Sequence, residues 1–383
     1  MKTYIEKHQD QMLQLLEKLV NIDSGSYDKA GVDQVGKLMK KLYQELDFEI
    51  KEIEQEEFGN HLIIKKKKQD NTKPTILIMT HMDTVFEKGT VKERPFRTDE
   101  NRAYGPGVID MKASLVSVYF AIRALLDSEK DSVYQVEILL TSDEEIGSLT
   151  SRELIEKRAT DKKYALVMEP ARKNGAIVSA RRGKGLYTLE VIGKAAHSGI
   201  EPEKGRSAIE ELAHKIIQFY EITDEEEGIH VNVGLIEGGT SVNTVSDHAT
   251  AQIDVRFRTQ EQVVEIKEQI KSIIESTEVD GTKVKIEGDI NRPPMEKTEQ
   301  TEQLLRIIKK VGDELDIFIK DTETGGGSDA SFTSALGIPT VDGLGPIGGR
   351  AHRESEYLEL NSFVPRTVLL AYVIDQLAKV NNE

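Results

Sequence analysis

Five side chains that can bind metal ions lie far apart in the chain: His81, Asp110, Glu145, Glu169 and His352. The clearest signal is His81-Met82-Asp83, directly after the apolar run of residues 76–79. Residues i and i+2 at the end of a strand point the same way. The Asp83 carboxylate can therefore accept one ring N–H of His81 while the other ring nitrogen binds a metal. This pattern predicts a dinuclear hydrolytic site.

A pair of adjacent carboxylates follows the apolar run of residues 136–141. Neighbouring residues that leave a strand point in different directions, so Glu144 and Glu145 can have different roles. One can bind a metal while the other acts as a general base towards water. Taken alone, the pair is also compatible with a solvated acidic turn.

The remaining candidates are each open to a simpler explanation. Asp110 follows a Gly-Pro-Gly loop that permits a tight turn, but it can equally be a helix N-cap. Glu169 ends a predicted strand, and His352 lies in a loop where a solvated histidine is common. Taken together, two histidines and three carboxylates give each of two zinc ions one imidazole and one terminal carboxylate, with the fifth ligand shared.

Length and composition exclude several classes of protein. A chain of 383 residues predicts two domains. The net charge of -16 argues against nucleic acid or an anionic membrane as a partner. The absence of cysteine excludes disulfides, thiol nucleophiles and cysteine-bound zinc. Because no signal peptide or long apolar run is recognisable, we expect a cytoplasmic protein.

Short apolar runs alternate with helical patterns in most of the chain, which predicts an α/β sandwich with a mainly parallel sheet. Strands are expected at residues 61–64, 74–80, 136–141, 164–168, 317–319 and 338–341, and helices at 3–20, 32–46, 111–126, 151–157, 301–311 and 362–380. In such sheets, sites gather beyond the carboxyl ends of strands. His81, Glu144, Glu145 and Glu169 each follow a predicted strand.

The pattern changes between residues 180 and 292. A β-α-β-β-α-β order predicts a compact α+β insertion of the ferredoxin-like type. We therefore expect a catalytic domain formed by residues 1–179 and 293–383 and a lid formed by residues 180–292. The amphipathic helix at residues 207–220 can line a dimer interface or pack on its own sheet.

The combination of motifs resembles the co-catalytic zinc peptidases and deacylases, which include aminoacylase, acetylornithine deacetylase and glutamate carboxypeptidase. The motifs are His81-x-Asp83, Gly-Pro-Gly-x-x-Asp110, Asp143-Glu144-Glu145, Glu169-Pro170, His197-Ser198-Gly199 and His352. His-Met-Asp-Thr-Val and Gly-Gly-Gly-Ser-Asp-Ala look closest to the carboxypeptidase G-like branch, although Met111 stands where many of its members carry a second aspartate.

The resemblance implies a role for each metal-site residue. His81 and Glu169 would complete one zinc site, Glu145 and His352 the other, and Asp110 would bridge them. Glu144 would be the general base that activates a bridging hydroxide, with Asp83 orienting His81 and a cis peptide after Asp110. Two Zn²⁺ ions per chain are expected, for which Co²⁺ or Mn²⁺ can substitute.

The resemblance also assigns residues to the substrate. His197 would stabilise the oxyanion, often in the site of a partner subunit, so we expect a homodimer formed through the lid. Asn243 resembles the family's substrate-binding asparagine. Arg292 can pair bidentately with a substrate carboxylate, and the loop around Gly326 offers backbone N–H groups to an anion.

The leading hypothesis is a zinc-dependent metallopeptidase that hydrolyses an amide bond next to a free carboxylate. A small peptide or an N-acyl amino acid would be the substrate. An N-acyl amino acid deacylase, or a di- or tripeptidase, is an alternative because the metal motifs do not distinguish these reactions. A non-catalytic metal-binding protein on the same scaffold is a more distant alternative.

Overall fold

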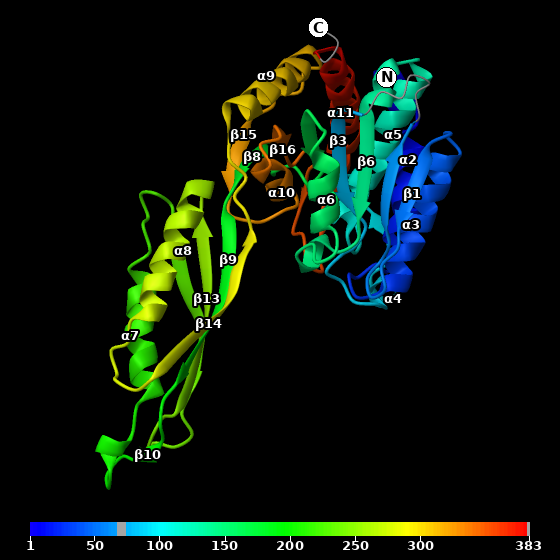
Figure 1. Cartoon of the computed structure of the whole chain (residues 1–383). Helices are drawn as coiled ribbons and strands as arrows, with labels where there is room; N and C mark the ends of the chain where they lie inside the picture. The colour runs from blue at the N-terminus through cyan, green and yellow to red at the C-terminus, as the bar shows by residue number, and fades with distance from the viewer. Residues whose placement is uncertain (67–73, 381–383) are drawn as a thin grey trace. The chain divides into compact units, whose positions relative to one another are not determined.

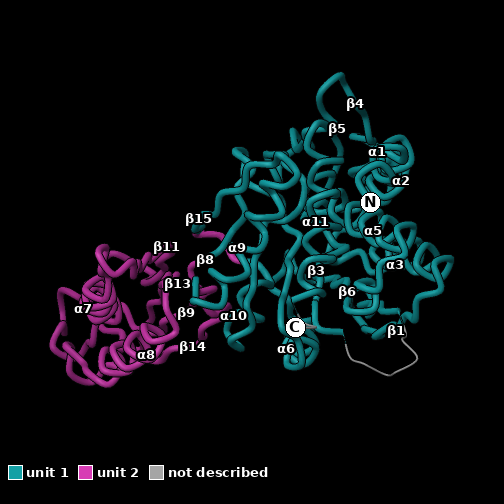
Figure 2. The backbone as a smooth tube through the Cα atoms, turned by 90° about the horizontal axis from the view of Figure 1, so that it is seen from above, with its two compact units in different colours: residues 1–180, 297–324, 328–383 teal, residues 181–296, 325–327 magenta. Residues whose placement is uncertain are grey.

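The computed structural model describes residues 1–66 and 74–380. The chain divides into two compact units, shown in different colours in Figure 2. Unit 1 contains residues 1–180, 297–324 and 328–383, and unit 2 contains residues 181–296 and 325–327. The short glycine segment 325–327 thus groups with unit 2, although the sequence pattern predicts that it belongs to the catalytic domain.

A six-stranded sheet forms the centre of unit 1 (Figure 1). In spatial order its strands are β1 (Glu49–Ile53), β2 (His61–Lys65), β6 (Val136–Thr141), β3 (Ile76–His81), β7 (Tyr164–Val167) and β16 (Thr340–Val341). The last four are mutually parallel, whereas β1 and β2 form an antiparallel edge. Every residue of β3 and β6 is buried, as expected for strands covered on both faces. The predicted mainly parallel sheet is confirmed.

Helices supply the apolar faces that bury this sheet. The helices of unit 1 are α1 (Lys2–Lys7), α2 (Gln9–Val20), α3 (Lys29–Gln44), α4 (Thr90–Glu93), α5 (Ala113–Asp127), α6 (Arg152–Ala159), α9 (Glu299–Glu314), α10 (Ala330–Ala335) and α11 (Leu360–Val380). α5 and α11 pack against each other and against β3, and both are buried along most of their length. In the part of the chain that the structure describes, no helix is long and apolar enough to cross a membrane.

Two smaller sheets complete unit 1, and neither is predicted by the sequence pattern. One contains β17 (Gly348–Gly349), β18 (Tyr357–Glu359), β5 (Arg102–Tyr104) and β4 (Arg97–Thr98), and the other pairs β15 (Asp321–Thr324) with β8 (Ile177–Arg181). The strand predicted at residues 317–319 is wrong. Ile317 and Ile319 pack against the core, while the polar residues after them pair with β8. The apolar spacing of Ile317 and Ile319 therefore reflects burial against the core and not strand pairing.

Unit 2 is a four-stranded antiparallel sheet with two helices. The spatial order is β11 (His230–Gly238), β13 (His248–Phe257), β9 (Gly183–Ile192) and β14 (Lys283–Arg292), with α7 (Ala208–Tyr220) and α8 (Gln260–Glu275) between strands in the sequence. This β-α-β-β-α-β order confirms the predicted ferredoxin-like α+β fold. α7 packs on β13 and β9, so this helix covers its own sheet.

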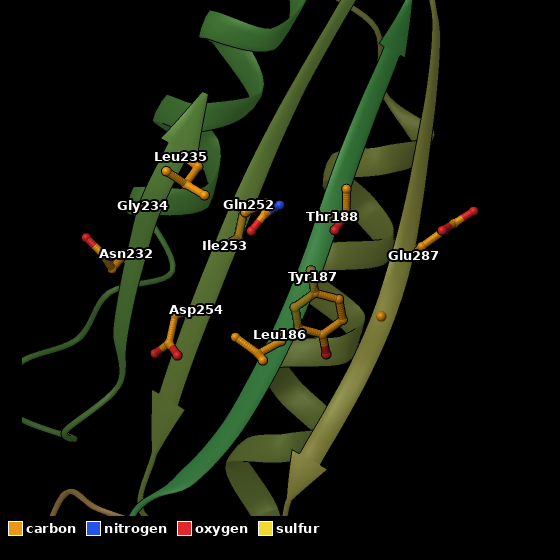
Figure 3. Close-up of a pocket in the computed structure, with 11 residues that line it drawn as sticks. Leu186, Tyr187, Thr188, Asn232, Gly234, Leu235, Gln252, Ile253, Asp254 and Glu287 are labelled. Atoms are coloured by element: carbon orange, nitrogen blue, oxygen red, sulfur yellow. The ribbon is translucent and has the colours of Figure 1, made fainter. Parts of the chain in front are cut away.

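The opposite face of the unit 2 sheet carries a shallow pocket of about 390 Å³ (Figure 3). Leu186, Thr188, Gln252, Asp254 and Leu235 are among its lining residues. The lining combines neutral polar, acidic and aliphatic side chains, and none of the predicted metal ligands belongs to it.

Candidate metal centre

Three parallel strands end at one edge of the unit 1 sheet and deliver candidate ligands there. His81 is the last residue of β3 and lies opposite Thr141, the last residue of β6. Glu145 follows β6, and Glu169 follows β7 after Met168. The shared strand direction therefore brings these side chains to the same edge, as the sequence predicts.

Asp110 occupies the centre of the group. It lies in the irregular turn Val108–Lys112, and the Asp110–Met111 peptide is cis, as predicted. Its two carboxylate oxygens face different imidazoles: Oδ1 is 3.3 Å from Nε2 of His81, and Oδ2 is 3.1 Å from Nε2 of His352. A carboxylate held between two imidazoles can bridge two cations, one at each oxygen.

The five side chains form two groups that share Asp110. In one, Nε2 of His81 is also 3.6 Å from Oε1 of Glu169. In the other, Nε2 of His352 is 3.1 Å from Oε2 of Glu145. Within each group the potential ligand atoms lie within 4.8 Å of one another. The structure thus assembles all five predicted ligands, each triad with one imidazole and two carboxylates.

The electrostatics of these groups favour a bound cation. Burial, followed by the charge of Asp110, raises the pKa of Glu169 well above its ordinary value. Burial also raises the pKa of Glu145, and Asp110 adds to that rise. Hydrogen bonds to Asp110 and then Glu145 raise the pKa of the His352 imidazole to about 11. Clustered carboxylates with so little solvent are unfavourable unless positive charge compensates them.

One buried atom supplies an independent sign that a ligand is needed. Within the described ranges 1–66 and 74–380, Oε1 of Glu145 is buried and has no hydrogen-bond partner. The other oxygen of Glu145 is the one that faces His352. Oxygen and imidazole donors of this kind suit zinc, so the residues present fit a pair of such ions.

Asp83 contacts both His81 and the turn that carries Glu144 and Glu145. The Nδ1 atom of His81 is 3.0 Å from the backbone carbonyl of Asp83 and 3.4 Å from its carboxylate oxygen Oδ1. The backbone N–H groups of Glu144 and Glu145 donate to this carboxylate at 3.3 and 3.2 Å, and the Ser26 hydroxyl donates at 2.7 Å. Asp83 therefore fixes the free nitrogen of His81 towards Asp110 and anchors the turn that carries both glutamates.

Glu144 starts a short 3-10 turn, Glu144–Ile146, directly beyond β6. Burial and Asp110 have larger effects on Glu169, but the Glu144 charge also contributes to the rise in the pKa of Glu169. The Glu144 carboxylate therefore acts electrostatically on the metal-site group without belonging to either triad.

The predicted substrate residues all lie in unit 2, but they do not converge within it. His197 lies in β10 (Ala196–His197), which pairs with β12 (Thr244–Val245), and the N–H of Ser198 donates to the Asn243 carbonyl at 3.0 Å. Arg292 ends β14, and the carbonyl of Gly326 accepts from Nη1 of Arg181 at 2.7 Å.

The strand register separates these two pairs. Arg292 lies opposite Lys184 near the start of β9, whereas the segment with His197 follows Ile192 at its end. At 3.3 Å per residue, the eight steps between these β9 positions span about 26 Å. The structure thus places His197 next to Asn243 at one end of unit 2. Arg292 lies at the other end, together with the glycine segment 325–327, so the two groups do not meet within this unit.

Two further residues at the site escaped sequence analysis. Ser26 donates to Asp83, as described above, and nothing in its local sequence indicates this. Glu356 is buried and accepts hydrogen bonds from the backbone N–H groups of Gly107, Ile109 and Asp110. It lies four residues after His352, but its contact with the Asp110 segment depends on the unpredicted pairing of β18 with β5.

Comparison with known proteins agrees with this fold. Residues 77–376 match the family described as Peptidase family M20/M25/M40. Carboxypeptidase G2 of Pseudomonas sp. (strain RS-16) is 27% identical over 371 residues, which cover 95% of this chain and 88% of that protein. Acetylornithine deacetylase of Vibrio campbellii is 28% identical over 264 residues, which cover 64% of this chain and 67% of that enzyme.

The crystal structure of aminopeptidase PepT from Bacillus cereus superimposes with a TM-score of 0.81 at 24% identity. The match covers 97% of this chain and 99% of PepT. The architecture is therefore shared along nearly the whole length of both chains. Because the family match spans most of the sequence, including every predicted metal ligand, the chain belongs to the M20/M25/M40 peptidase family.

Proposed function

We propose that the protein is a zinc-dependent metallopeptidase that hydrolyses an amide bond next to a free carboxylate, in the manner of a glutamate carboxypeptidase. The observation that carries the proposal is Asp110, whose two oxygens face His81 and His352. His81, Asp110 and Glu169 would hold one Zn²⁺ and Asp110, Glu145 and His352 the other. Co²⁺ or Mn²⁺ would also support the reaction. The absence of cysteine fits a cytoplasmic enzyme.

When bound, the zinc pair supplies Lewis-acid polarisation of the substrate carbonyl and lowers the pKa of water. Glu144 takes a proton from the attacking water and passes it to the leaving amine. Asp83 keeps Nδ1 of His81 occupied, so that Nε2 stays directed at Asp110. The adjacent glutamates thus divide the work, with Glu145 as ligand and Glu144 as base.

We assign residues 180–292 to a lid that also forms a homodimer. β11 is the edge strand of the unit 2 sheet, and Leu235 and Ile236 on it are each 60% exposed. On the neighbouring helix α7, Ile209 and Ile217 are also exposed. An exposed edge strand flanked by aliphatic side chains favours pairing with a second copy.

Dimer formation would give His197 and Asn243 a role in catalysis. These residues lie at the far end of the unit 2 sheet from Arg292, so one chain does not collect all of them within this unit. We propose that His197 and Asn243 serve the site of the partner subunit, where His197 stabilises the oxyanion.

Arg292 and the Gly326 segment would bind the free carboxylate of the substrate. Arg292 is 8% exposed and packs against Gly327, and the Arg181 guanidinium donates to the carbonyls of Gly326 and Gly327. Arginine side chains fixed around a glycine-rich backbone are suited to bidentate carboxylate recognition. Arg292 and the Gly326 segment would therefore favour substrates that carry an acidic side chain or a free C-terminal carboxylate.

A second candidate function is hydrolysis of an N-acyl amino acid, or of a di- or tripeptide, by the same metal chemistry. The similarity to acetylornithine deacetylase supports the deacylase, and a metal-binding protein without catalysis is the remaining alternative. Carboxypeptidase and deacylase reactions differ in the group on the acyl side of the bond, and the metal ligands alone do not distinguish them.

A hydrolysis screen separates these candidates. Zinc-loaded protein would be tested on C-terminal glutamyl dipeptides, N-acyl amino acids and tripeptides, with chelator-treated protein as the control. We expect preference for an acidic C-terminal residue, and loss of that preference in Arg292→Ala. Preference for N-acetyl amino acids would overturn the carboxypeptidase assignment, and absence of any metal-dependent hydrolysis would favour the non-catalytic alternative.

A further inference from the structure

Two loops that meet beside the metal-site group deliver Asp110 and His352. The small sheet of unit 1 pairs β18 with β5 in antiparallel register, so that Tyr357 lies opposite Tyr104. The chain leaves β5 towards Asp110 and enters β18 from the His352 loop. Residue 356 therefore stands where the two loops begin to diverge.

Glu356 joins these loops through both of its carboxylate oxygens. Oε1 accepts from the N–H groups of Ile109 and Asp110 at 2.9 and 3.1 Å, and Oε2 accepts from the N–H of Gly107 at 3.2 Å. Glu356 is 1% exposed. Backbone donors buried in an irregular turn need such acceptors, and here the two oxygens of one side chain accept three of these hydrogen bonds.

The tip of the His352 loop is exposed to solvent. The His352 side chain is 52% exposed, and Arg350 and His352 both adopt left-handed backbone conformations, with φ of 58° and 64°. Such conformations are unfavourable for residues other than glycine and persist only where surrounding contacts fix them. Glu356 is the buried anchor that follows this loop.

We propose that Glu356 is a positioning residue that fixes the Asp110 turn against the His352 loop and thereby sets the metal affinity of the group formed by Asp110, Glu145 and His352. Glu356 belongs to neither ligand triad. Glu356 acts on Asp110 through the backbone N–H of that residue, and on His352 through the loop that ends at Glu356. The inference rests on the proposed two-metal function, and it adds a determinant of metal affinity beyond the ligands.

Glu356→Gln tests this role because it keeps the side-chain length but places an NH₂ group where an acceptor is needed. Glu354→Gln, at an exposed position on the same loop, is the matched control. Metal-free proteins would be titrated calorimetrically with Zn²⁺, and His352→Ala would identify the binding step that depends on His352. We expect Glu356→Gln to weaken that step about 10- to 100-fold, the range found for groups that orient metal ligands. Glu354→Gln should bind like the wild type.

Amide hydrogen exchange of the metal-free proteins provides a second readout that needs no metal. We expect Glu356→Gln to exchange faster in residues 107–110 and 350–356 while β3 keeps its protection. Should Glu356→Gln fail to fold, Glu356→Asp, which keeps the charge but not the reach, replaces it in both measurements.

The outcomes are distinguishable. Wild-type protein that binds no Zn²⁺ would contradict the proposed function itself. Wild-type protein that binds two ions, with a folded Glu356→Gln variant of unchanged affinity and unchanged exchange, would overturn the positioning role alone. A lowered melting temperature with unchanged metal affinity would show that Glu356 only stabilises the fold, and it would also overturn the inference.

Discussion

The two units deliver chemical groups in different ways. In unit 1, parallel strands end at the same edge, so His81, Glu145 and Glu169 meet although they are far apart in sequence. In unit 2, neighbouring strands run in opposite directions, so their carboxyl ends lie at both ends of the sheet. His197 and Arg292 consequently lie at opposite ends of β9.

This contrast has a consequence for catalysis. A single chain can complete the proposed metal site within unit 1, because one end of the parallel sheet and two adjoining loops supply every candidate ligand. Within unit 2, a single chain separates the proposed oxyanion group from the proposed carboxylate-binding group. We therefore expect changes in unit 1 to abolish metal binding or chemistry, and changes in unit 2 to act on substrate binding and on cooperation between subunits.

The largest effect is expected from the adjacent glutamates of unit 1. Glu144→Ala should lower kcat by about 10²- to 10⁴-fold, the range for loss of a general acid–base group, while zinc content stays unchanged. Glu145→Ala should lose one zinc ion, because Glu145 belongs to the His352 triad. Metal analysis and steady-state kinetics on the same preparations check both. Near wild-type turnover in Glu144→Ala would rule out its role as base.

The next effect tests whether unit 2 acts across subunits. His197→Ala should lower kcat by about 10²- to 10³-fold, as loss of an oxyanion donor does elsewhere. Mixing His197→Ala with Glu144→Ala chains should restore part of the activity, because a mixed dimer contains one site with both groups intact. Activity would be measured before and after subunit exchange. Absence of recovery in demonstrated mixed dimers would place His197 in its own chain's site.

A smaller effect is expected at the other end of the same sheet. Arg292→Ala should raise KM for substrates with an acidic C-terminal residue by about 10- to 100-fold, which corresponds to a lost hydrogen bond to a charged group. Arg292→Lys should recover only part of this, because lysine keeps the charge but not the bidentate geometry. Equal loss on substrates that carry no free carboxylate would contradict a carboxylate-binding role.

The smallest effect concerns stability in unit 1. Burial would by itself raise the pKa of Asp321, but hydrogen bonds from Lys297 and Lys309 outweigh burial. The pKa of Asp321 therefore lies well below its ordinary value. Because the pKa of Asp321 is lower in the folded than in the unfolded protein, the charged carboxylate stabilises the fold at pH values above its unfolded pKa, near 4. This stabilisation is lost as the pH falls and the carboxylate becomes protonated. Asp321→Asn should therefore cost about 1 kcal/mol at neutral pH, since the lysines are partly exposed, and the difference should vanish in acid.

Denaturant unfolding at several pH values measures this difference. Asp280→Asn, at an exposed position of unit 2, is the control and should show no comparable pH-dependent loss. A difference between wild type and Asp321→Asn that persists unchanged at low pH would show that charge pairing is not its cause.

The same contrast explains how much could be predicted from the sequence. His81 and Glu169 directly follow apolar runs, and Glu145 comes four residues after one. Their strands and the shared end of the sheet were therefore predictable from periodicity and parallel topology. The ferredoxin-like order of unit 2 was predictable for a similar reason, because its two central strands, β9 and β13, alternate in burial. Local pattern is sufficient where an element buries a regular face.

Loop contacts were less accessible to sequence reasoning. The pairing of β5 with β18 involves three residues per strand, too few to produce a periodic signal. The role of Glu356 depends on that pairing, and the bond from Ser26 to Asp83 joins positions 57 residues apart. Local pattern left Asp110 and His352 open to simpler explanations, a helix N-cap and a solvated loop histidine, because irregular turns with special backbone geometry leave no apolar repeat.

The most direct test of the central claim is zinc content per chain in protein purified without chelator, measured alongside His352→Ala and Asp110→Ala. Two zinc ions are predicted for the wild type, one for His352→Ala, and less than one for Asp110→Ala, because Asp110 belongs to both triads. Less than one zinc ion in the wild type, or two in Asp110→Ala, would contradict a shared two-metal site.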